Sequence, residues 1–208
     1  MIGFYDYTVI LTYMSAVSAV LGIIFAANGH VNWAVCCLLI SGICDGFDGK
    51  VAKKKKNRSE QQKMFGIQID SLCDLIAFGV LPAVIMHCSG LKGVVNDIIK
   101  VAYVLAAVIR LAYYNVMEEE SLRTTSQSRN YFQGLPVTSI SIIMPIIFTI
   151  QKILLKQTFG TGLNITMAAV AILFITDVKI KKPTMKMVLV SVIFSVCIMG
   201  YIIYHYVS

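Results

Sequence analysis

Four aspartates have the type and spacing to do chemistry together. Asp45 and Asp48 close one apolar stretch of the sequence. Asp70 and Asp74 open the next one. Because residues three or four apart are neighbours on a helix surface, each pair is expected on one helical face. Two such pairs on adjacent antiparallel helices would converge into a single cluster of carboxylates.

A cluster of this kind calls for a cation. An Asp inside a membrane-spanning helix costs about 2.5–3.5 kcal/mol at the helix centre on insertion scales, and close anions repel one another unless a cation neutralises them. Carboxylates that reach water and pair with nearby lysines are the alternative, but Asp45, Asp70 and Asp74 each adjoin an apolar run. Oxygen ligands without His or Cys predict Mg²⁺ or Mn²⁺ rather than zinc. Magnesium bound by carboxylates commonly also contacts substrate phosphates, which indicates phosphate chemistry.

Small residues accompany the aspartates. Gly49 follows Asp48 directly, Ala52 lies one turn later, and Gly66 precedes Asp70 by one turn. Small side chains let a bulky polar ligand approach the helix backbone, and they also permit close helix packing in membranes. We favour a ligand contact for Gly49, whereas both interpretations stay open for Gly66.

The elements that must position these residues are membrane helices. The chain has 208 residues, 57% of them hydrophobic and 14% charged, with a mean hydropathy of +0.76, which fits a bilayer rather than a water-soluble surface. Since a crossing needs about 20 apolar residues, we expect an all-α polytopic membrane protein with about seven transmembrane helices, forming a single integral membrane catalytic domain over 1–208. The predicted helices are 8–28, 31–52, 67–88, 94–116, 136–156, 160–177 and 186–206.

The basic residues predict the orientation. If the helices alternate, the second-to-third, fourth-to-fifth and sixth-to-seventh connections share one side and carry most of the Lys and Arg residues. The positive-inside rule makes that side cytoplasmic, with the N-terminus inside and the C-terminus outside. Topology thus explains the net charge of +7, and no nucleic-acid partner is expected. Two interpretations stay open for the lysine-rich run 50–63: it serves topology alone, or it also attracts anionic lipid, at about 1 kcal/mol per residue. The opposite side receives the three histidines, which are poor catalytic candidates: His30, His87 and His205.

The four aspartates and the small residues beside them resemble the signature of the CDP-alcohol phosphatidyltransferases, DxxDGxxAR followed by GxxxDxxxD. The chain supplies DGFDGKVAK over 45–53 and GIQIDSLCD over 66–74. Lys53 replaces the family's Arg, which keeps the charge but loses the bidentate fork, and the spacer before Gly66 is longer than usual. The resemblance implies a general base at Asp74. It implies metal ligands at Asp45, Asp48, Asp70 and Asp74, and contacts to the nucleotide of CDP-diacylglycerol at Asp45, Gly49, Ala52, Lys53 and Gly66.

Segments beyond the signature narrow the range of acceptor substrates that the resemblance implies. Residues 70–82, 109–115 and 132–136 resemble those of the family's serine-using members of the membrane-spanning bacterial and archaeal type. This implies transfer of a phosphatidyl group from CDP-diacylglycerol to L-serine, giving phosphatidylserine and CMP, at the cytoplasmic membrane and by a homodimer. A sibling enzyme using glycerol 3-phosphate or an inositol phosphate is the alternative, but those acceptors would favour a denser basic pocket.

Arg110 lies within an apolar helix, where an unpaired Arg costs at least about 2.5 kcal/mol. It is therefore predicted to bind an anion, either a substrate phosphate or the serine carboxylate, with a structural pair to an Asp as the alternative. Arg129 and Gln133 belong to the connection expected to cover the site, where Arg129 either contacts phosphate or carboxylate or is a solvated loop charge. A cation transporter would place carboxylates at the bilayer midplane. Their position at one edge, without an internal repeat, favours an enzyme.

Overall fold

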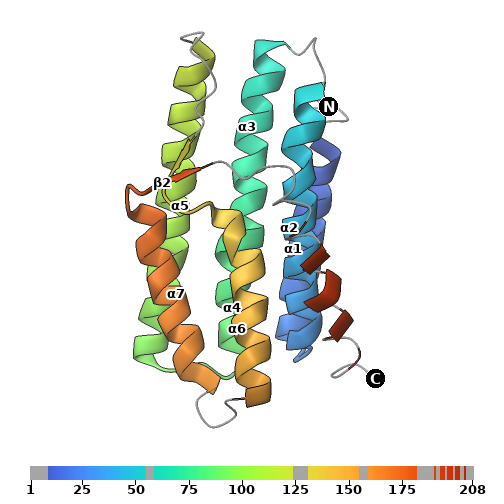
Figure 1. Ribbon diagram of the computed structural model, residues 1–208, viewed down its shortest axis with the longest axis vertical. Helices are drawn as coiled ribbons and strands as arrows, with labels where there is room; N and C mark the ends of the chain where they lie inside the picture. Colours follow the sequence, from blue (N-terminus) through green and yellow to red (C-terminus); the bar gives the residue numbers. More distant parts are fainter. Residues whose placement is uncertain are drawn as a thin grey trace.

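The computed structural model describes the backbone at residues 9–54, 59–123, 131–154 and 159–181 and at separate positions between 190 and 204, with side chains described over somewhat fewer of these. Figure 1 shows the helices running side by side along the long axis, with the two short strands near mid-height. The elements are α1 (Ile10–Ala27), α2 (Val31–Lys54), α3 (Glu60–Asp74), the π-helix η2 (Leu75–Val80), α4 (Leu81–Cys88), α5 (Val94–Arg123), β1 (Tyr131–Gln133), the 3₁₀-helix η3 (Val137–Ser139), α6 (Ile140–Leu154), α7 (Phe159–Ile175) and β2 (Lys179–Lys181).

The predicted all-α class is confirmed, and the first six predicted segments coincide with helices. Within 186–206, every residue that the structure describes is helical. By length and composition, two of the described helices suffice to cross a membrane, α1 and the continuous run Glu60–Cys88. That run begins at Glu60 rather than at 67, because Ser59 forms a capping box with Gln62, a start signal that hydropathy does not register. The fourth helix likewise continues beyond its predicted end at 116, to Arg123.

Serine side chains hold α1 against α2. The hydroxyl of Ser15 donates to the Ser41 carbonyl at 3.3 Å, and the Ser41 hydroxyl donates to the Ser15 carbonyl at 3.0 Å. Ser18 donates to the Cys37 carbonyl at 2.9 Å. Small side chains that hydrogen-bond across an interface are typical of membrane helix packing. The contact anchors the part of α2 that leads directly to Asp45.

The strands β1 and β2 pair antiparallel, with Phe132 opposite Ile180, an element that the hydropathy pattern did not predict. Beyond the strands, the Leu135 amide donates to the Leu173 carbonyl at 3.2 Å. The connection that enters α6 therefore lies against the one that leaves α7. Alternating helices would place these two connections on the same side, so the pairing agrees with the predicted alternation.

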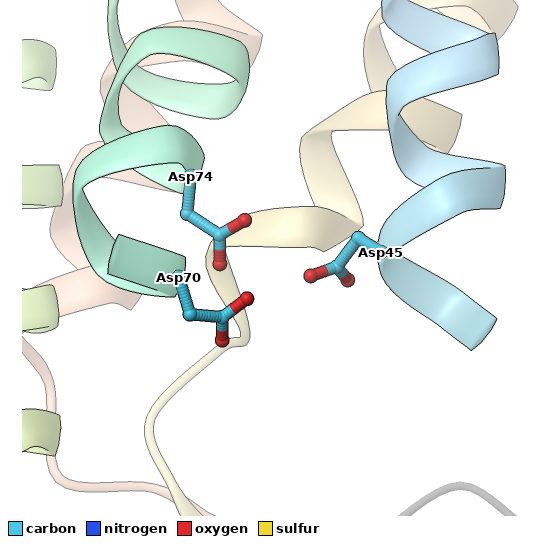
Figure 2. A group of neighbouring side chains, drawn as sticks. All are labelled: Asp45, Asp70 and Asp74. Carbon is cyan, nitrogen blue, oxygen red and sulfur yellow. The ribbon is translucent and has the colours of Figure 1, made fainter. Parts of the chain in front are cut away.

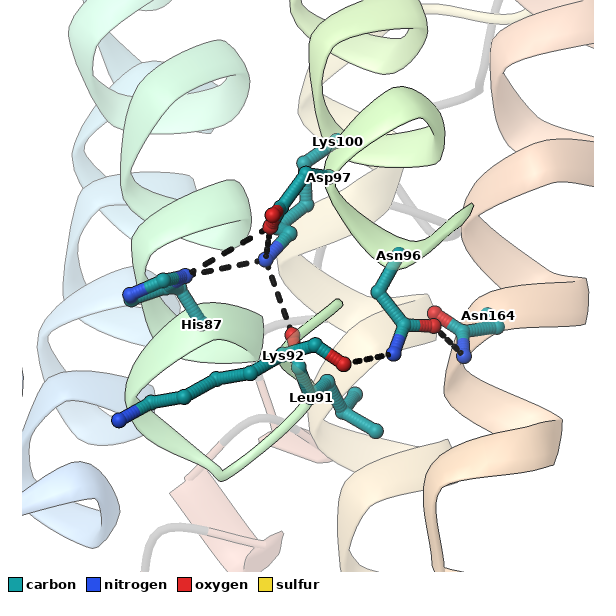
Figure 3. Close-up of polar contacts among 7 residues, drawn as sticks. All are labelled: His87, Leu91, Lys92, Asn96, Asp97, Lys100 and Asn164. Carbon is teal, nitrogen blue, oxygen red and sulfur yellow. Dashed lines mark hydrogen bonds and ion pairs between the residues drawn. The ribbon is translucent and has the colours of Figure 1, made fainter. Parts of the chain in front are cut away.

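A buried lysine fixes the connection between α4 and α5, near the N-terminal end of α5 (Figure 3). The Lys100 ammonium lies 2.9 Å from the Leu91 carbonyl, 3.1 Å from His87 Nδ1 and 2.7 Å from Asp97 Oδ1. An ammonium has three N–H donors, so these three contacts match its full capacity. His87 belongs to this cluster, as expected for a histidine on the side away from the aspartates.

Candidate active site

Three of the four aspartates converge in space. Asp45 comes from α2, and Asp70 and Asp74 come from successive turns of α3. One carboxylate oxygen from each lies within 4.8 Å of those of the other two. Figure 2 shows the two α3 side chains pointing across the gap between the helices toward Asp45. Asp74 is only 8% exposed, whereas Asp45 and Asp70 are partly exposed, so the cluster reaches from the surface into the interior.

The ligand chemistry of this cluster fits a hard divalent cation. Mg²⁺ keeps its oxygen ligands about 2.0–2.1 Å away, so ligands on opposite sides of the ion lie about 4 Å apart. One oxygen from each of the three carboxylates lies within 4.8 Å of the other two. A small rotation of the side chains would bring these oxygens to the spacing that Mg²⁺ requires. Carboxylate oxygens are the ligands preferred by Mg²⁺ and Mn²⁺.

The other predicted site residues are described only in part. Gly66 lies in α3, one turn before Asp70, and is partly exposed. Arg129 lies outside the described residues, and Gln133 is described only as part of the backbone of β1. Four more belong to the helical backbone of α2, with their side chains outside the described part: Asp48, Gly49, Ala52 and Lys53. The roles assigned to all of these residues stay predictions.

A cavity of about 160 Å³ opens beside the carboxylates. Its walls come from α2, α3, α5 and the turn at η3. Besides the three aspartates, its polar lining consists of one guanidinium and three hydroxyl-bearing side chains, from Arg110, Ser71, Tyr114 and Thr138. A cavity that combines both signs of charge with hydroxyl groups suits a small polar ligand that carries an anionic group.

Arg110 is held by backbone carbonyls. Its side chain is 7% exposed, and it donates from Nε to the Leu135 carbonyl at 2.8 Å and from a terminal nitrogen to the Gly134 carbonyl at 3.2 Å. The sequence predicts a substrate anion or an Asp as the partner, whereas the structure shows a third kind of partner, the backbone carbonyl oxygens. The same guanidinium lines the cavity, so a substrate anion there remains compatible with these bonds.

Gly134 makes this arrangement possible. Its φ is +75°, in the left-handed region that glycine adopts without steric cost. A Cβ at this position would lie 3.0 Å from the Thr176 carbonyl oxygen and 3.1 Å from a terminal nitrogen of Arg110. The turn therefore needs glycine both for its backbone conformation and for the close approach of Arg110.

Three polar residues of the cavity lining are not among the site residues predicted from the sequence, namely Ser71, Tyr114 and Thr138. Tyr114 lies four residues after Arg110 and thus on the same face of α5, a signal that was available in the sequence. The Ser71 hydroxyl donates to Asn115 Oδ1 at 2.5 Å, a contact between two helices. Thr138 reaches the cavity only because the turn at η3 folds back against α5, and no local pattern indicates this.

Comparison with known proteins identifies the family. The family model named CDP-alcohol phosphatidyltransferase matches residues 7–197. A CDP-diacylglycerol–serine O-phosphatidyltransferase of Mycobacterium bovis is 28% identical over 180 residues, which cover 83% of this chain and 59% of the relative. The Saccharomyces cerevisiae protein of the same name is 32% identical over 128 residues, covering 60% of this chain and 45% of the relative. An archaetidylserine synthase of Methanothermobacter thermautotrophicus is 28% identical over 172 residues, which cover 82% of this chain and 67% of the relative.

The chain thus spans about half to two thirds of the length of these curated relatives. The matched range 7–197 contains the three converging aspartates, Arg110 and the paired strands. Its apolar helices agree with a family of membrane enzymes. The chain belongs to the CDP-alcohol phosphatidyltransferase family.

Proposed function

We propose that this protein transfers the phosphatidyl group of CDP-diacylglycerol to L-serine, giving phosphatidylserine and CMP. The observation that carries the proposal is the convergence of Asp45, Asp70 and Asp74 within 4.8 Å, beside a cavity that also contains Arg110. Phosphoryl transfer depends on positioning and on neutralising charge, and this cavity brings together groups for both. The names of the relatives from Mycobacterium bovis and Saccharomyces cerevisiae support serine as the acceptor.

The carboxylates of Asp45, Asp48, Asp70 and Asp74 would hold Mg²⁺ or Mn²⁺. When bound, the ion supplies Lewis-acid stabilisation of the negative charge on the pyrophosphate and on the departing CMP. A bound cation would stabilise the cluster, because several negative charges close together in a partly buried site repel one another. We therefore expect activity to depend strictly on divalent metal.

Asp74 is our candidate for the general base. Its carboxylate would take the proton from the serine hydroxyl while that oxygen bonds to the diacylglycerol-linked phosphorus. The bond from this phosphorus to the bridging oxygen breaks, and CMP leaves with the electron pair. A carboxylate is a weak base for an alcohol, so holding the hydroxyl in line with the leaving group must supply much of the rate. The low exposure of Asp74, 8%, would help to keep water from competing with serine.

Other residues would bind the substrates. Arg110 offers a cation at the cavity wall for the serine carboxylate or a substrate phosphate. Arg129 and Gln133, in the connection between α5 and α6, are proposed as further contacts to the serine or phosphate. The signature's remaining members would contact the nucleotide, together with Asp45: Gly49, Ala52, Lys53 and Gly66.

We place this activity in a single integral membrane domain over 1–208 that crosses the cytoplasmic membrane several times, with the site open to the cytoplasm and the protein a homodimer. The signature 45–74 and the segments at 109–136 would form its catalytic part. Support for the orientation comes from the Lys and Arg residues, which concentrate on alternate connections. The pairing of β1 with β2 is consistent with it, because two of those connections then meet.

Acceptor specificity can be tested directly. Purified protein would be given CDP-diacylglycerol with Mg²⁺ or Mn²⁺ and, in separate reactions, serine, glycerol 3-phosphate or an inositol phosphate. We expect CMP release only with serine, and none after chelation of the metal. An Asp74→Asn preparation made in parallel, which is expected to lack the general base, controls for contaminating enzymes. Release that depends on another acceptor and not on serine would overturn the assignment.

A further inference from the structure

The helix that carries Asp70 and Asp74 changes its winding immediately after Asp74. There α3 gives way to the π-helix η2, which continues into α4. The sequence offers a reason in Pro82, which has no N–H for the carbonyl four residues earlier, and whose ring would clash with it in an α-helix. That carbonyl belongs to Phe78. Single π turns inside α-helices occur frequently at functional sites, and this one begins directly after Asp74.

The Phe78 carbonyl is bound from a neighbouring helix. The hydroxyl of Tyr103, on α5, donates to it at 2.5 Å, and both side chains are fully buried at 0% exposure. The Tyr103 ring also packs against Phe174 of α7, with ring centroids 5.5 Å apart. Pro82 has no N–H to donate to the buried Phe78 carbonyl. The Tyr103 hydroxyl donates to this carbonyl instead, and the contact with Phe174 holds the Tyr103 ring in place.

This bond connects the two helices that form most of the cavity. Tyr103, Arg110 and Tyr114 are spaced by seven and four residues and therefore share one face of α5. The helices η2 and α5 pack closely: a Cβ added to Gly79 would lie only 3.5 Å from the Ala107 Cβ. A change in the bond at η2 would therefore rotate or shift the carboxylates of α3 relative to Arg110.

We propose that Tyr103 is a positioning residue, whose hydrogen bond to the Phe78 carbonyl sets the orientation of Asp70 and Asp74 for binding a divalent cation. Tyr103 is not among the residues that line the cavity, so it acts through the backbone of η2. The inference rests on the proposed function only in treating the carboxylates as metal ligands.

The test uses the full chain in detergent and measures Mn²⁺ binding by electron paramagnetic resonance without any substrate. Tyr103→Phe keeps the ring against Phe174 and removes only the hydroxyl. We expect the Mn²⁺ dissociation constant to rise about threefold to tenfold, the range that corresponds to one hydrogen bond. Tyr13→Phe removes a hydroxyl from a partly exposed tyrosine of α1 and should leave Mn²⁺ binding unchanged. Equal affinity in the wild type and Tyr103→Phe would overturn the proposal, as would a wild type that binds no Mn²⁺.

A second pair of variants tests whether the Tyr103 hydroxyl positions the aspartates or only provides a hydrogen bond to the buried Phe78 carbonyl. Pro82→Ala restores an N–H that can bond to the Phe78 carbonyl. In this background, Tyr103→Phe should cost little thermal stability, yet it should still weaken Mn²⁺ binding by a similar factor, because the link to α5 is gone. Full recovery of Mn²⁺ affinity in the double variant would show that the hydroxyl only satisfies the carbonyl, and would overturn the positioning role.

Failure of this inference is distinguishable from failure of the proposed function. The proposed function fails if the wild type shows no serine-dependent release of CMP. The inference is decided by Mn²⁺ affinities measured without CDP-diacylglycerol or serine, so a different acceptor would leave its result intact.

Discussion

The hydroxyl of Ser71 donates a 2.5 Å hydrogen bond to the side chain of Asn115, and this bond joins α3 to α5 directly beside the cavity. Asn115 in turn donates to Gln68 Oε1 at 3.4 Å. Ser71 follows Asp70 in the chain, and Asn115 follows Tyr114. The pair therefore connects two walls of the cavity at the residues that adjoin its polar lining.

We predict that Ser71 and Asn115 are energetically coupled. Ser71→Ala should lower the free energy of unfolding by about 0.5–1.5 kcal/mol, the usual net value of one hydrogen bond. Asn115→Ala should lower it by at least as much, because it also removes the bond to Gln68. The double variant should lose less than the sum of the two, because the second substitution removes a bond that is already broken. Denaturant unfolding in detergent, followed by circular dichroism, measures all four proteins. Strictly additive losses would show that the bond contributes no coupling.

Asp74→Asn should separate binding from chemistry. The amide keeps the shape of the side chain but cannot take a proton from serine, so we expect CMP release to fall by about a hundredfold or more. Binding of CDP-diacylglycerol at saturating metal should change by no more than about threefold. Asp177→Asn, at an exposed aspartate after α7, is the matched control and should keep normal turnover. An Asp74→Asn enzyme with normal turnover would show that Asp74 is not the base.

Asp45→Asn should show itself in the metal dependence. Replacing one anionic ligand with a neutral one weakens binding of a hard cation, so we expect the Mn²⁺ concentration that gives half-maximal CMP release to rise at least about tenfold. Excess Mn²⁺ should restore part of the activity. The measurement is a metal titration of the wild type beside the variant, and identical titration curves would exclude Asp45 as a ligand.

Arg110→Lys should affect both stability and substrate use. Lysine keeps the charge but lacks the planar fork that reaches two carbonyls, so we expect kcat/KM for serine to fall at least about tenfold. Lys100→Met is the control, because Lys100 is another buried cation of α5, at 7% exposure, that lies near the N-terminal end of the helix and does not line the cavity. It should lower the melting temperature and leave kcat/KM within about twofold. Unchanged serine and lipid kinetics in Arg110→Lys and Arg110→Ala would leave Arg110 only a structural role.

Gly134→Ala should destabilise the turn that holds Arg110. A left-handed conformation costs a non-glycine residue about 1–2 kcal/mol, and here the added Cβ would also lie 3.0 Å from a backbone carbonyl oxygen. Gly29→Ala is a matched control, since Gly29 has a similar φ of +83° but nothing within 4 Å of the added Cβ. The difference in unfolding free energy between the two variants measures the contact. Equal losses, with full activity in Gly134→Ala, would contradict a role for this turn in the site.

Local periodicity was enough to predict much of this protein. Apolar runs located the helices, and the four-residue interval between Asp70 and Asp74 placed them on one face, because a helix has the same geometry wherever it occurs. The signature residues identified the family before any three-dimensional information. The helix start at Ser59 was also present in the sequence as a capping box, although hydropathy alone placed it seven residues too late.

The partners of these residues depended on tertiary structure. The carbonyls that receive Arg110, the pairing of β1 with β2 and the bond from Tyr103 to the Phe78 carbonyl each join segments more than twenty residues apart. Periodicity determines which face of a helix a side chain occupies, whereas the group it meets there depends on how distant segments pack. For Arg110 the sequence could therefore state that a buried guanidinium needs acceptors, and only the fold could supply Gly134 and Leu135.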